Sequence, residues 1–318
     1  MFLQIEKDLK ILDINLNKMV GPRHPILYAA SEHLFKARGK RVRPSIILLV
    51  GKATSINEEL LNEHKRLAEI TEIIHTASLL HDDVIDDCSQ RRGSGTVNNQ
   101  FSNKTAILAG DFLFAQSSWY LANLNNLEVV RIISKIITDL AEGEAQQAST
   151  YFDTSTSINS YMNKSFHKTA SLLASSCKAS AILSNADNYT QHQFYNYGKH
   201  LGLAFQIIDD ILDIIGTHKN MGKVPGLDLK NGNLTSPLLF SLQECNDLYE
   251  LIEREFDNNG DIEYAINLIK STRGLEKAKD LAIEHTQAAI QSLKNLNYQN
   301  SSISDLITVS DYIINRIR

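Results

Sequence analysis

Two short runs of carboxylates with the same spacing are the part of this sequence best suited to chemistry. The first lies in "HDDVIDD" (residues 81–87) and the second in "IDDILD" (residues 208–213), so both contain the pattern DDxxD. Like charges this close repel one another unless a cation neutralises them. Mg²⁺ commonly binds one or two carboxylates together with substrate phosphate oxygens. Either run alone is also typical of a solvated acidic helix end, but the pair favours Mg²⁺ ions that bridge a phosphate ligand.

The text around both runs predicts helices. No proline occurs between Pro44 and Pro225, and proline is the residue that most strongly breaks a helix. Apolar residues recur at helical spacing, as at Leu67, Ile70 and Ile74. We therefore expect one all-α domain that is larger than average.

The first run has a defined position if residues 63–87 form one helix. At about 100° per residue, positions seven and eleven residues apart lie within roughly 20° of one line. His75, Asp82 and Asp86 then share one stripe of the helix surface. This stripe would present two carboxylates to the same cation.

Composition excludes several classes of protein. The 318 residues are 43% apolar and carry a net charge of -5, which gives no electrostatic footprint for nucleic acid. Cys88, Cys177 and Cys245 are scattered and form no CxxC, so we expect neither structural disulfides nor a zinc site. The first residues lack the pattern of a signal or transit peptide. The apolar runs are too short for a transmembrane segment.

Seven motifs in order resemble the trans-prenyl diphosphate synthases, the polyprenyl synthetase family, over nearly the whole chain. They are "GKRVRP" (39–44), "IHTASLLHDDVIDD" (74–87), "RRG" (91–93), "AGDFLFAQ" (109–116), "HKTASL" (167–172), "FQIIDDILD" (205–213) and "GKVPGLDLKNGNLTSPLL" (222–239). The resemblance implies a single-domain isoprenoid-synthase bundle over residues 1–318, with long helices around a deep central cavity. It also implies a homodimer.

The implied reaction is the head-to-tail condensation of isopentenyl diphosphate with an allylic diphosphate. The resemblance assigns Asp82, Asp86 and Asp209 to two or three Mg²⁺ ions that bridge the diphosphate. Such ions would neutralise the charge that develops on the departing pyrophosphate. Lys168 and Gln206 complete the implied catalytic set.

The same resemblance assigns two anion sites. The isopentenyl diphosphate site would comprise Lys40, Arg43, His75 and Arg92. The allylic diphosphate site would comprise Arg91, Lys168, Thr169, Gln206 and Lys223. Many members of the family have a lysine at the position of Asn233, and that lysine provides a cationic contact to the diphosphate. We do not assign this role to Asn233.

These residues also have structural interpretations. Lys40, Arg41 and Arg43 by themselves are typical of a basic helix start, and a histidine on an apolar helix is more often a core residue. Arg91 and Arg92 are also compatible with surface ion pairs, which stabilise little. The position of His75 on the aspartate stripe favours a functional role.

The residues just before Asp82 indicate the length of the product. Short-chain relatives often carry a large aromatic side chain here, whereas this chain has Ala77 and Ser78. Small residues also permit close helix packing. We nevertheless expect them to leave a tunnel open for the growing chain. The product would then be long and of the solanesyl class, which supplies plastoquinone side chains. Because such a product is apolar, its release is compatible with peripheral contact between the protein and a membrane. The form "GNLTSP" and the Asn- and Ile-rich text favour a plastid-encoded protein of the chloroplast stroma, with the bacterial cytoplasm as the alternative.

Three other functions compete with this hypothesis. A terpene cyclase would share one aspartate motif, but the second DDxxD and "GKRVRP" argue for two diphosphate substrates. A non-catalytic subunit of a heteromeric synthase would be expected to lack aspartates or the RRG pair, and this chain keeps both. A shorter-chain, geranylgeranyl-type synthase is the main alternative.

Overall fold

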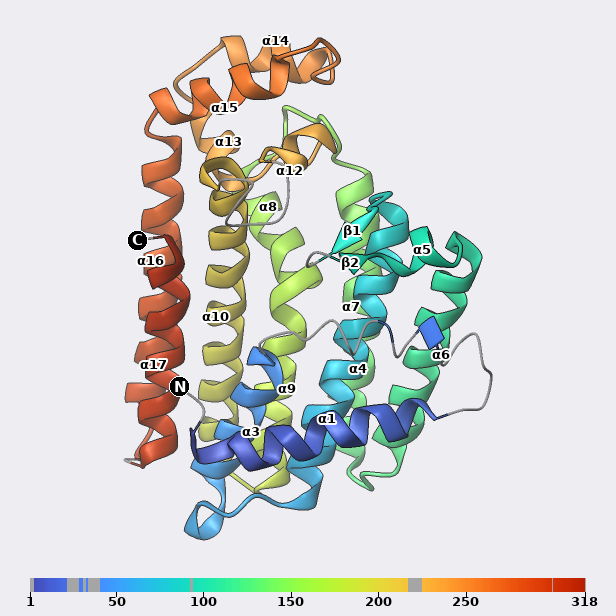
Figure 1. Cartoon of the computed structure of the whole chain (residues 1–318). Coiled ribbons are helices and arrows are strands. Elements are labelled where there is room, and N and C mark those ends of the chain that lie inside the picture. The colour runs from blue at the N-terminus through green and yellow to red at the C-terminus, as the bar shows by residue number, and fades with distance from the viewer. Residues whose placement is uncertain are drawn as a thin grey trace. The chain divides into compact units, whose positions relative to one another are not determined.

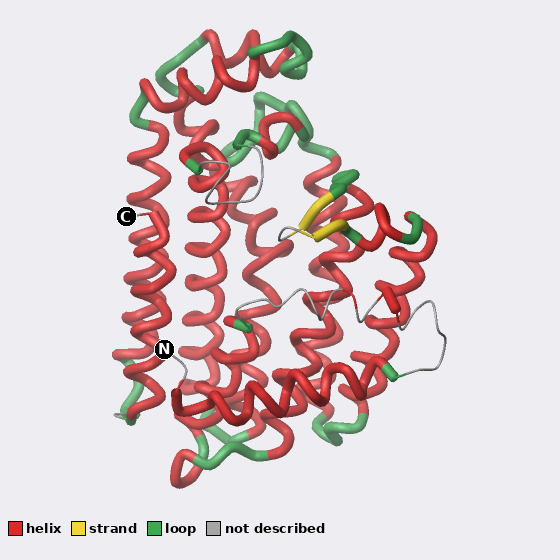
Figure 2. The backbone as a smooth tube through the Cα atoms, viewed as in Figure 1, coloured by secondary structure: helices red, strands yellow, loops and turns green. Residues whose placement is uncertain are grey.

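The computed structural model of this chain is almost entirely helical (Figure 2). It describes residues 3–21, 29–30, 33, 41–91, 94–216, 225–298 and 300–317. Within these residues the strands are β1 (Gln90–Arg91) and β2 (Ser94–Gly95), which pair antiparallel as a short hairpin. The prediction of an all-α fold is confirmed.

The residues group into two compact units, which are described separately. Unit 1 comprises Met1–Ile137, Leu172–Tyr195 and Asn295–Thr308, and unit 2 comprises Thr138–Ser171, Asn196–Lys294 and Val309–Arg318. Helices α7 (Leu127–Ala148), α10 (Asn188–Ile215) and α17 (Ser301–Ile314) contribute residues to both units. One domain over residues 1–318 stays a prediction.

Unit 1 is organised around α4, which carries the first acidic run (Figure 1). Its other elements are η1 (Leu3–Ile5), α1 (Glu6–Val20), α3 (Val42–Thr54), η2 (Ile56–Glu58), α5 (Val97–Gln100), α6 (Asn103–Ala122) and nearly all of α9 (Ser171–Leu183). Helix α4 (Asn62–Ile85) contacts α1, α3, α5 and α6. Its side chains Leu67, Ile70, Ile73 and Leu80 are fully buried. A helix that is apolar on several sides is stable only when neighbours cover it.

Helix α4 ends at Ile85, two residues before the predicted end at residue 87. Asp86 caps the helix, and Asp87 has a left-handed backbone with φ 49°. Aspartate adopts this conformation more readily than most residues. The N–H of Cys88 then donates to the backbone oxygen of Asp83 at 2.9 Å. The first acidic run therefore forms the end of the helix as well as part of its surface.

Unit 2 contains the part of α10 that carries the second acidic run. Its other elements are α8 (Ile158–Ser165), η3 (Phe166–Ala170), α12 (Leu227–Lys230), α13 (Ser236–Ser241), α14 (Asp247–Glu253), α15 (Asp261–Ser271), α16 (Gly274–Lys294) and η4 (Asn315–Ile317). Helix α10 approaches η3 closely at Gly202, where a Cβ atom would lie 2.7 Å from the Cα of Ala170. Glycine is the residue that fits this contact.

In the described part of the chain, no helix combines the length and the apolar content needed to cross a bilayer.

Candidate active site

Asp82 and Asp86 lie one turn apart at the end of α4, and both are partly exposed. The N–H of Asp86 donates to the backbone oxygen of Asp82 at 2.8 Å, so the helical register continues to the cap. Residues four apart on a helix lie on the same face. The two carboxylates therefore have the spacing that suits a shared divalent cation.

Asp83, between them, is turned into the protein. It is 1% exposed, and its Oδ1 accepts from Nε and Nη2 of Arg91 at 2.8 and 2.7 Å. Burial opposes the charge on Arg91, but the hydrogen bond and the attraction of Asp83 outweigh it and raise the pKa of the guanidinium. Among the described residues, Asp83 Oδ2 has no hydrogen-bond partner. The contact fixes the β1–β2 hairpin beside the aspartates.

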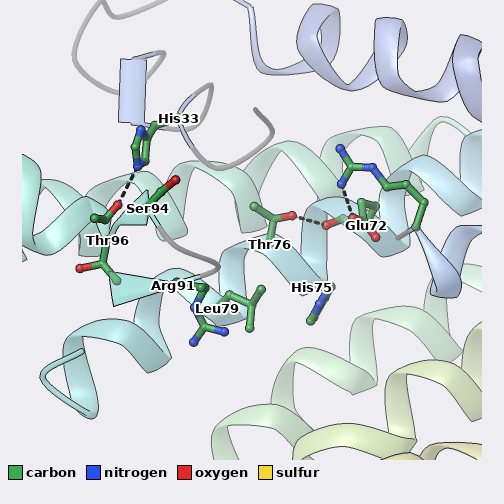
Figure 3. Close-up of a pocket in the computed structure, with 10 residues that line it drawn as sticks. His33, Glu72, His75, Thr76, Leu79, Arg91, Ser94 and Thr96 are labelled. Atoms are coloured by element: carbon green, nitrogen blue, oxygen red, sulfur yellow. Dashed lines mark hydrogen bonds and ion pairs between the residues drawn. The ribbon is translucent and has the colours of Figure 1, made fainter. Parts of the chain in front are cut away.

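A pocket of unit 1 contains two of the predicted anion-binding residues, His75 and Arg91 (Figure 3). It is lined by His33, Arg41, Glu72, His75, Thr76, Leu79, Arg91, Ser94, Gly95 and Thr96. Nη1 of Arg43 donates to Nε2 of His75 at 3.0 Å, which requires the hydrogen of a neutral His75 to be on Nδ1. The structure thus brings Arg43 and His75 together, as the predicted isopentenyl diphosphate site requires.

Arg41, for which the sequence suggested only a basic helix start, joins the wall of this pocket to α1. Its guanidinium pairs with Glu72 of α4 and with Asp13 of α1, the latter at 3.0 Å. Arg41 therefore balances the charge of Glu72 in the pocket wall.

In the second acidic run, Asp210 is buried and held by two hydrogen bonds. The Tyr161 hydroxyl donates to its Oδ2 at 2.6 Å, and Nε2 of Gln206 donates to its Oδ1 at 2.8 Å. Burial raises the pKa of the Asp210 carboxyl to about 7, although both hydrogen bonds act in the opposite direction. Asp210 thus anchors α8 to α10 and orients Gln206.

Asp213 binds the backbone that follows the second run. Its side chain accepts from the N–H groups of Leu227 and Asp228 at 3.3 and 3.1 Å, and its backbone oxygen accepts from Gly226 at 2.9 Å. Gly226 has φ 79°, a left-handed conformation that favours glycine. The carboxylate therefore caps the amino end of α12 and joins it to α10.

Asp209 is the most accessible carboxylate of this run, with 40% of its side chain exposed. Nη2 of Arg316 lies 2.8 Å from its Oδ1, and the guanidinium lies 4.9 Å from the ring centre of Phe205. No pattern in the sequence pointed to Arg316, because its partner is distant along the chain. The contact shows that a cation can be bound at the Asp209 carboxylate.

Lys168 and Thr169 lie in η3, a single π-helical turn. Oγ1 of Thr169 donates to Oε1 of Gln206 at 2.7 Å, which links the turn to Asp210 through Gln206. The Lys168 ammonium lies 2.6 Å from Oε1 of Glu144 and donates to Oε1 of Gln147 at 3.1 Å. The structure thus groups Lys168, Thr169 and Gln206 in unit 2, and their assignment to an allylic diphosphate site stays a prediction.

Two further ionisable residues of unit 2 were not singled out from the sequence. Burial lowers the pKa of Lys164, although Asp210 and Asp228 act in the opposite direction. Burial and the charges of Asp213 and Asp210 raise the pKa of Asp228 well above its usual range. The motif "LDLKNG" contains Asp228, so the sequence held a signal for this residue.

Lys40, Arg92 and Lys223 lie outside the described residues. Of the two predicted chain-length residues, Ala77 is fully buried on α4. Ser78 is partly buried, and its Oγ donates to the backbone oxygen of His75 at 2.9 Å.

The predicted metal ligands have the donor chemistry that Mg²⁺ requires. Asp82, Asp86 and Asp209 offer carboxylate oxygens, and the ion pair with Arg316 shows that Asp209 attracts a cation. No group of three or more His, Cys, Asp or Glu side chains in the described ranges is arranged to hold an ion unaided. Mg²⁺ bound by one or two carboxylates and by substrate phosphates needs no such group. The residues therefore fit this ion.

A nearly all-helical chain with a DDxxD run on each of two long helices, and with Lys, Thr and Gln grouped beside the second run, has the features of a prenyl diphosphate synthase. The family model for polyprenyl synthetase matches residues 24–269. The chain belongs to the polyprenyl synthetase family and is a prenyltransferase, as the sequence predicted.

Relatives cover nearly the whole chain. It is 55% identical to a prenyl transferase of Porphyra purpurea over 100% of this chain and 98% of the other. It is 47% identical to the chloroplastic solanesyl diphosphate synthase 1 of Arabidopsis thaliana over 96% of this chain and 77% of the other.

Solved structures share the fold. The heptaprenyl diphosphate synthase of Staphylococcus aureus has a TM-score of 0.94 at 31% identity, covering 99% of both chains. A polyprenyl synthase of Caulobacter crescentus, complexed with calcium and isoprenyl diphosphate, has a TM-score of 0.92 at 29% identity, covering 98% of this chain and 96% of the other.

Proposed function

We propose that this prenyltransferase condenses isopentenyl diphosphate with an allylic diphosphate, head to tail, into a long all-trans polyprenyl diphosphate. The observation that carries the proposal is that each of two helices bears a DDxxD run with a guanidinium bound to one of its carboxylates. Such carboxylates suit divalent cations and a diphosphate. The identity to chloroplastic solanesyl diphosphate synthase supports the long product.

We infer that Mg²⁺ is the metal cofactor, with two or three ions at the diphosphate. Asp82, Asp86 and Asp209 would hold these ions, and Asp83, Asp210 and Asp213 would keep the runs in shape through their protein contacts. Bound there, Mg²⁺ would supply Lewis-acid neutralisation of charge on the leaving pyrophosphate. The calcium in the Caulobacter crescentus enzyme supports a site for hard divalent ions.

The cationic and polar residues would bind the two diphosphates separately. Arg43 and His75 are within hydrogen-bonding distance of each other in unit 1, and we assign them, with Lys40 and Arg92, to isopentenyl diphosphate. Lys168 and Thr169 are adjacent in η3, and Thr169 contacts Gln206. We assign these three residues, with Arg91 and Lys223, to the allylic diphosphate. Arginine suits phosphate through its planar fork, and lysine acts as a mobile point charge.

The proposed product is of the solanesyl class, for the plastoquinone side chain, made by a plastid protein. Relatives from Porphyra purpurea, Cyanophora paradoxa and Synechocystis are compatible with either a plastid or a bacterial cytoplasm, and the chloroplastic plant relatives favour the plastid. Plastid encoding is part of this proposal. Peripheral contact with a membrane at product release is compatible with this proposal.

We also propose a homodimer. Helix α6 exposes Ile107, Leu108 and Trp119, of which Trp119 is 56% exposed, and apolar surface of this kind suits contact with a second copy. Light scattering that gives the mass of a single chain at micromolar concentration would contradict this proposal.

The function is tested by incubating the purified chain with labelled isopentenyl diphosphate, Mg²⁺ and farnesyl or geranylgeranyl diphosphate, followed by chromatography of the products. We expect long all-trans chains and no incorporation after EDTA treatment, with recovery on adding excess Mg²⁺. Accumulation of geranylgeranyl diphosphate alone would support the shorter-chain alternative. No incorporation under any condition would support a non-catalytic subunit.

A further inference from the structure

The Lys168 ammonium is held by two residues of α7 that have no assigned role. Its Nζ lies 2.6 Å from Oε1 of Glu144 and 3.1 Å from Oε1 of Gln147. The side chains of Lys168 and Glu144 are 23% and 19% exposed, and Gln147 is 5% exposed. Glu144 and Gln147 are three residues apart on a helix, so they present their oxygens on the same face.

The backbone of α7 also contacts the turn that carries Lys168. A Cβ atom at Gly143 would lie 2.9 Å from the backbone nitrogen of Lys168 and 3.2 Å from its Cα. A side chain at this position would push the two backbones apart. Gly143 therefore allows the approach that lets the neighbouring Glu144 reach the ammonium.

The turn itself needs such support. Residues Phe166–Ala170 form a π-helical turn, a rare conformation that occurs frequently at functional sites. On the α10 side, Gly202 is in backbone contact with Ala170, and Gln206 accepts from Thr169 at 2.7 Å. Contacts with α7 and α10 thus fix two consecutive side chains of the turn.

We propose that Glu144 and Gln147 are positioning residues that fix the Lys168 ammonium for the allylic diphosphate. This inference rests on the proposed function, in which Lys168 binds that substrate. A lysine side chain is long and flexible, and ordering it before the substrate arrives removes part of the entropic cost of binding. Glu144 and Gln147 act through Lys168 and do not themselves contact the substrate.

The test is a double-mutant cycle measured by steady-state kinetics with farnesyl diphosphate. Glu144→Ala and Gln147→Ala should each lower kcat/KM for the allylic substrate by about tenfold or more, since small displacements of a binding group are costly. Their KM for isopentenyl diphosphate should stay within about twofold of wild type. Glu144→Gln retains an acceptor oxygen and should recover part of the loss. Glu144→Ala in a Lys168→Ala background should cause no further loss, because the partner it positions is already absent.

The matched control is Glu142→Ala. Glu142 is two residues away on the same helix and is 60% exposed, and its carboxylate is directed towards His167 at 3.7 Å. This variant should retain wild-type kinetics for both substrates. A loss equal to that of Glu144→Ala would indicate a general charge effect of α7 and overturn the proposal.

Two other outcomes would also overturn it. One is that Glu144→Ala lowers kcat/KM for the allylic substrate as much in the Lys168→Ala background as in the wild-type protein. The other is that kcat/KM is unchanged in both Glu144→Ala and Gln147→Ala. Unchanged allylic kinetics in Lys168→Ala would overturn both this inference and the assignment of Lys168. Product formation by the wild-type chain would still support the overall reaction in that case, so the two failures are distinguishable.

Discussion

At the scale of single residues, the carboxylates of the two acidic runs differ in what surrounds them. Asp83, Asp210 and Asp213 are buried and bind protein groups: Arg91, Tyr161 with Gln206, and the start of α12. Asp82 and Asp209 keep part of their surface accessible. The resemblance assigns metal ions to Asp82, Asp86 and Asp209 and leaves two roles open for Asp83, Asp210 and Asp213: holding the runs together, or reaching a metal ion through water. The protein contacts of these three residues fit the first role, and the metal assignment stays a prediction.

Replacing an accessible aspartate should therefore affect rate more than stability. We expect Asp82→Ala or Asp209→Ala to lower turnover by about 10²–10³, the usual loss when one group that stabilises developing charge is removed. Thermal unfolding followed by circular dichroism should change little. Asp280→Ala, at an exposed position of α16, is the control and should be fully active. Near-normal turnover in either aspartate variant would refute its role as a metal ligand.

Contacts between residues distant in sequence could not be predicted. Arg316 reaches Asp209, and Glu144 reaches Lys168, through the packing of helices that local sequence does not specify. Asp228 could have been identified from the sequence, because it lies in the family motif "GKVPGLDLKNGNLTSPLL" (222–239).

At the scale of elements, the absence of proline and the apolar spacing correctly predicted long helices. The end of α4 was predicted two residues too far, because Asp87 adopts a left-handed backbone that a periodicity argument does not detect. The π-helical turn η3 was not predicted either. Its geometry accompanies close backbone contacts at Gly143 and Gly202, and these arise from tertiary packing.

A histidine pair between α10 and α16 should make stability depend on pH. Nδ1 of His200 lies 2.8 Å from Nδ1 of His285, so one of these nitrogens must be unprotonated. Burial, and for His200 also the charge of His285, lowers the pKa of both imidazoles, that of His200 to about 4. The unfolded chain then binds more protons below about pH 6.5, the ordinary histidine pKa. Stability from this pair is complete above that pH and is lost as the pH falls towards 4.

Urea unfolding at several pH values between about 7.5 and 5 measures this effect. The slope should reach at most about 1.4 kcal/mol per pH unit for each histidine. The double variant His200→Gln with His285→Gln should show a shallower slope than wild type. His192→Gln, at an exposed position of α10, should keep the wild-type slope. Equal slopes in the double variant and the wild type would exclude the pair as the cause.

At the scale of the whole molecule, the order of the seven motifs was sufficient to predict the family, and the match over residues 24–269 confirms it. Motif order is a property of the entire chain, so it survives errors in single helix boundaries. Only some of the cationic side chains assigned to the two diphosphates can be located in the structure, because Lys40, Arg92 and Lys223 lie outside the described residues. Their roles stay predictions that rest on the resemblance.

Product length is also a property of the whole molecule, and Ala77 and Ser78 give the means to test it. Ala77 is fully buried on α4, five positions before Asp82. If the growing chain passes this position, Ala77→Phe would place a ring in its path, and overpacking typically costs about 1–3 kcal/mol. A barrier of that size slows each blocked elongation step by between about fivefold and about 150-fold. We expect Ala77→Phe and Ser78→Phe to release shorter products while the first condensation continues, as measured by chromatography of the labelled products.

Ala282→Phe is the matched control, because Ala282 is as fully buried as Ala77 but lies on α16, which carries none of the residues assigned to the metal ions or the substrates. It should cost stability and leave product length unchanged. Wild-type product length at a comparable rate in both Ala77→Phe and Ser78→Phe would show that this face of α4 does not line the path of the growing chain.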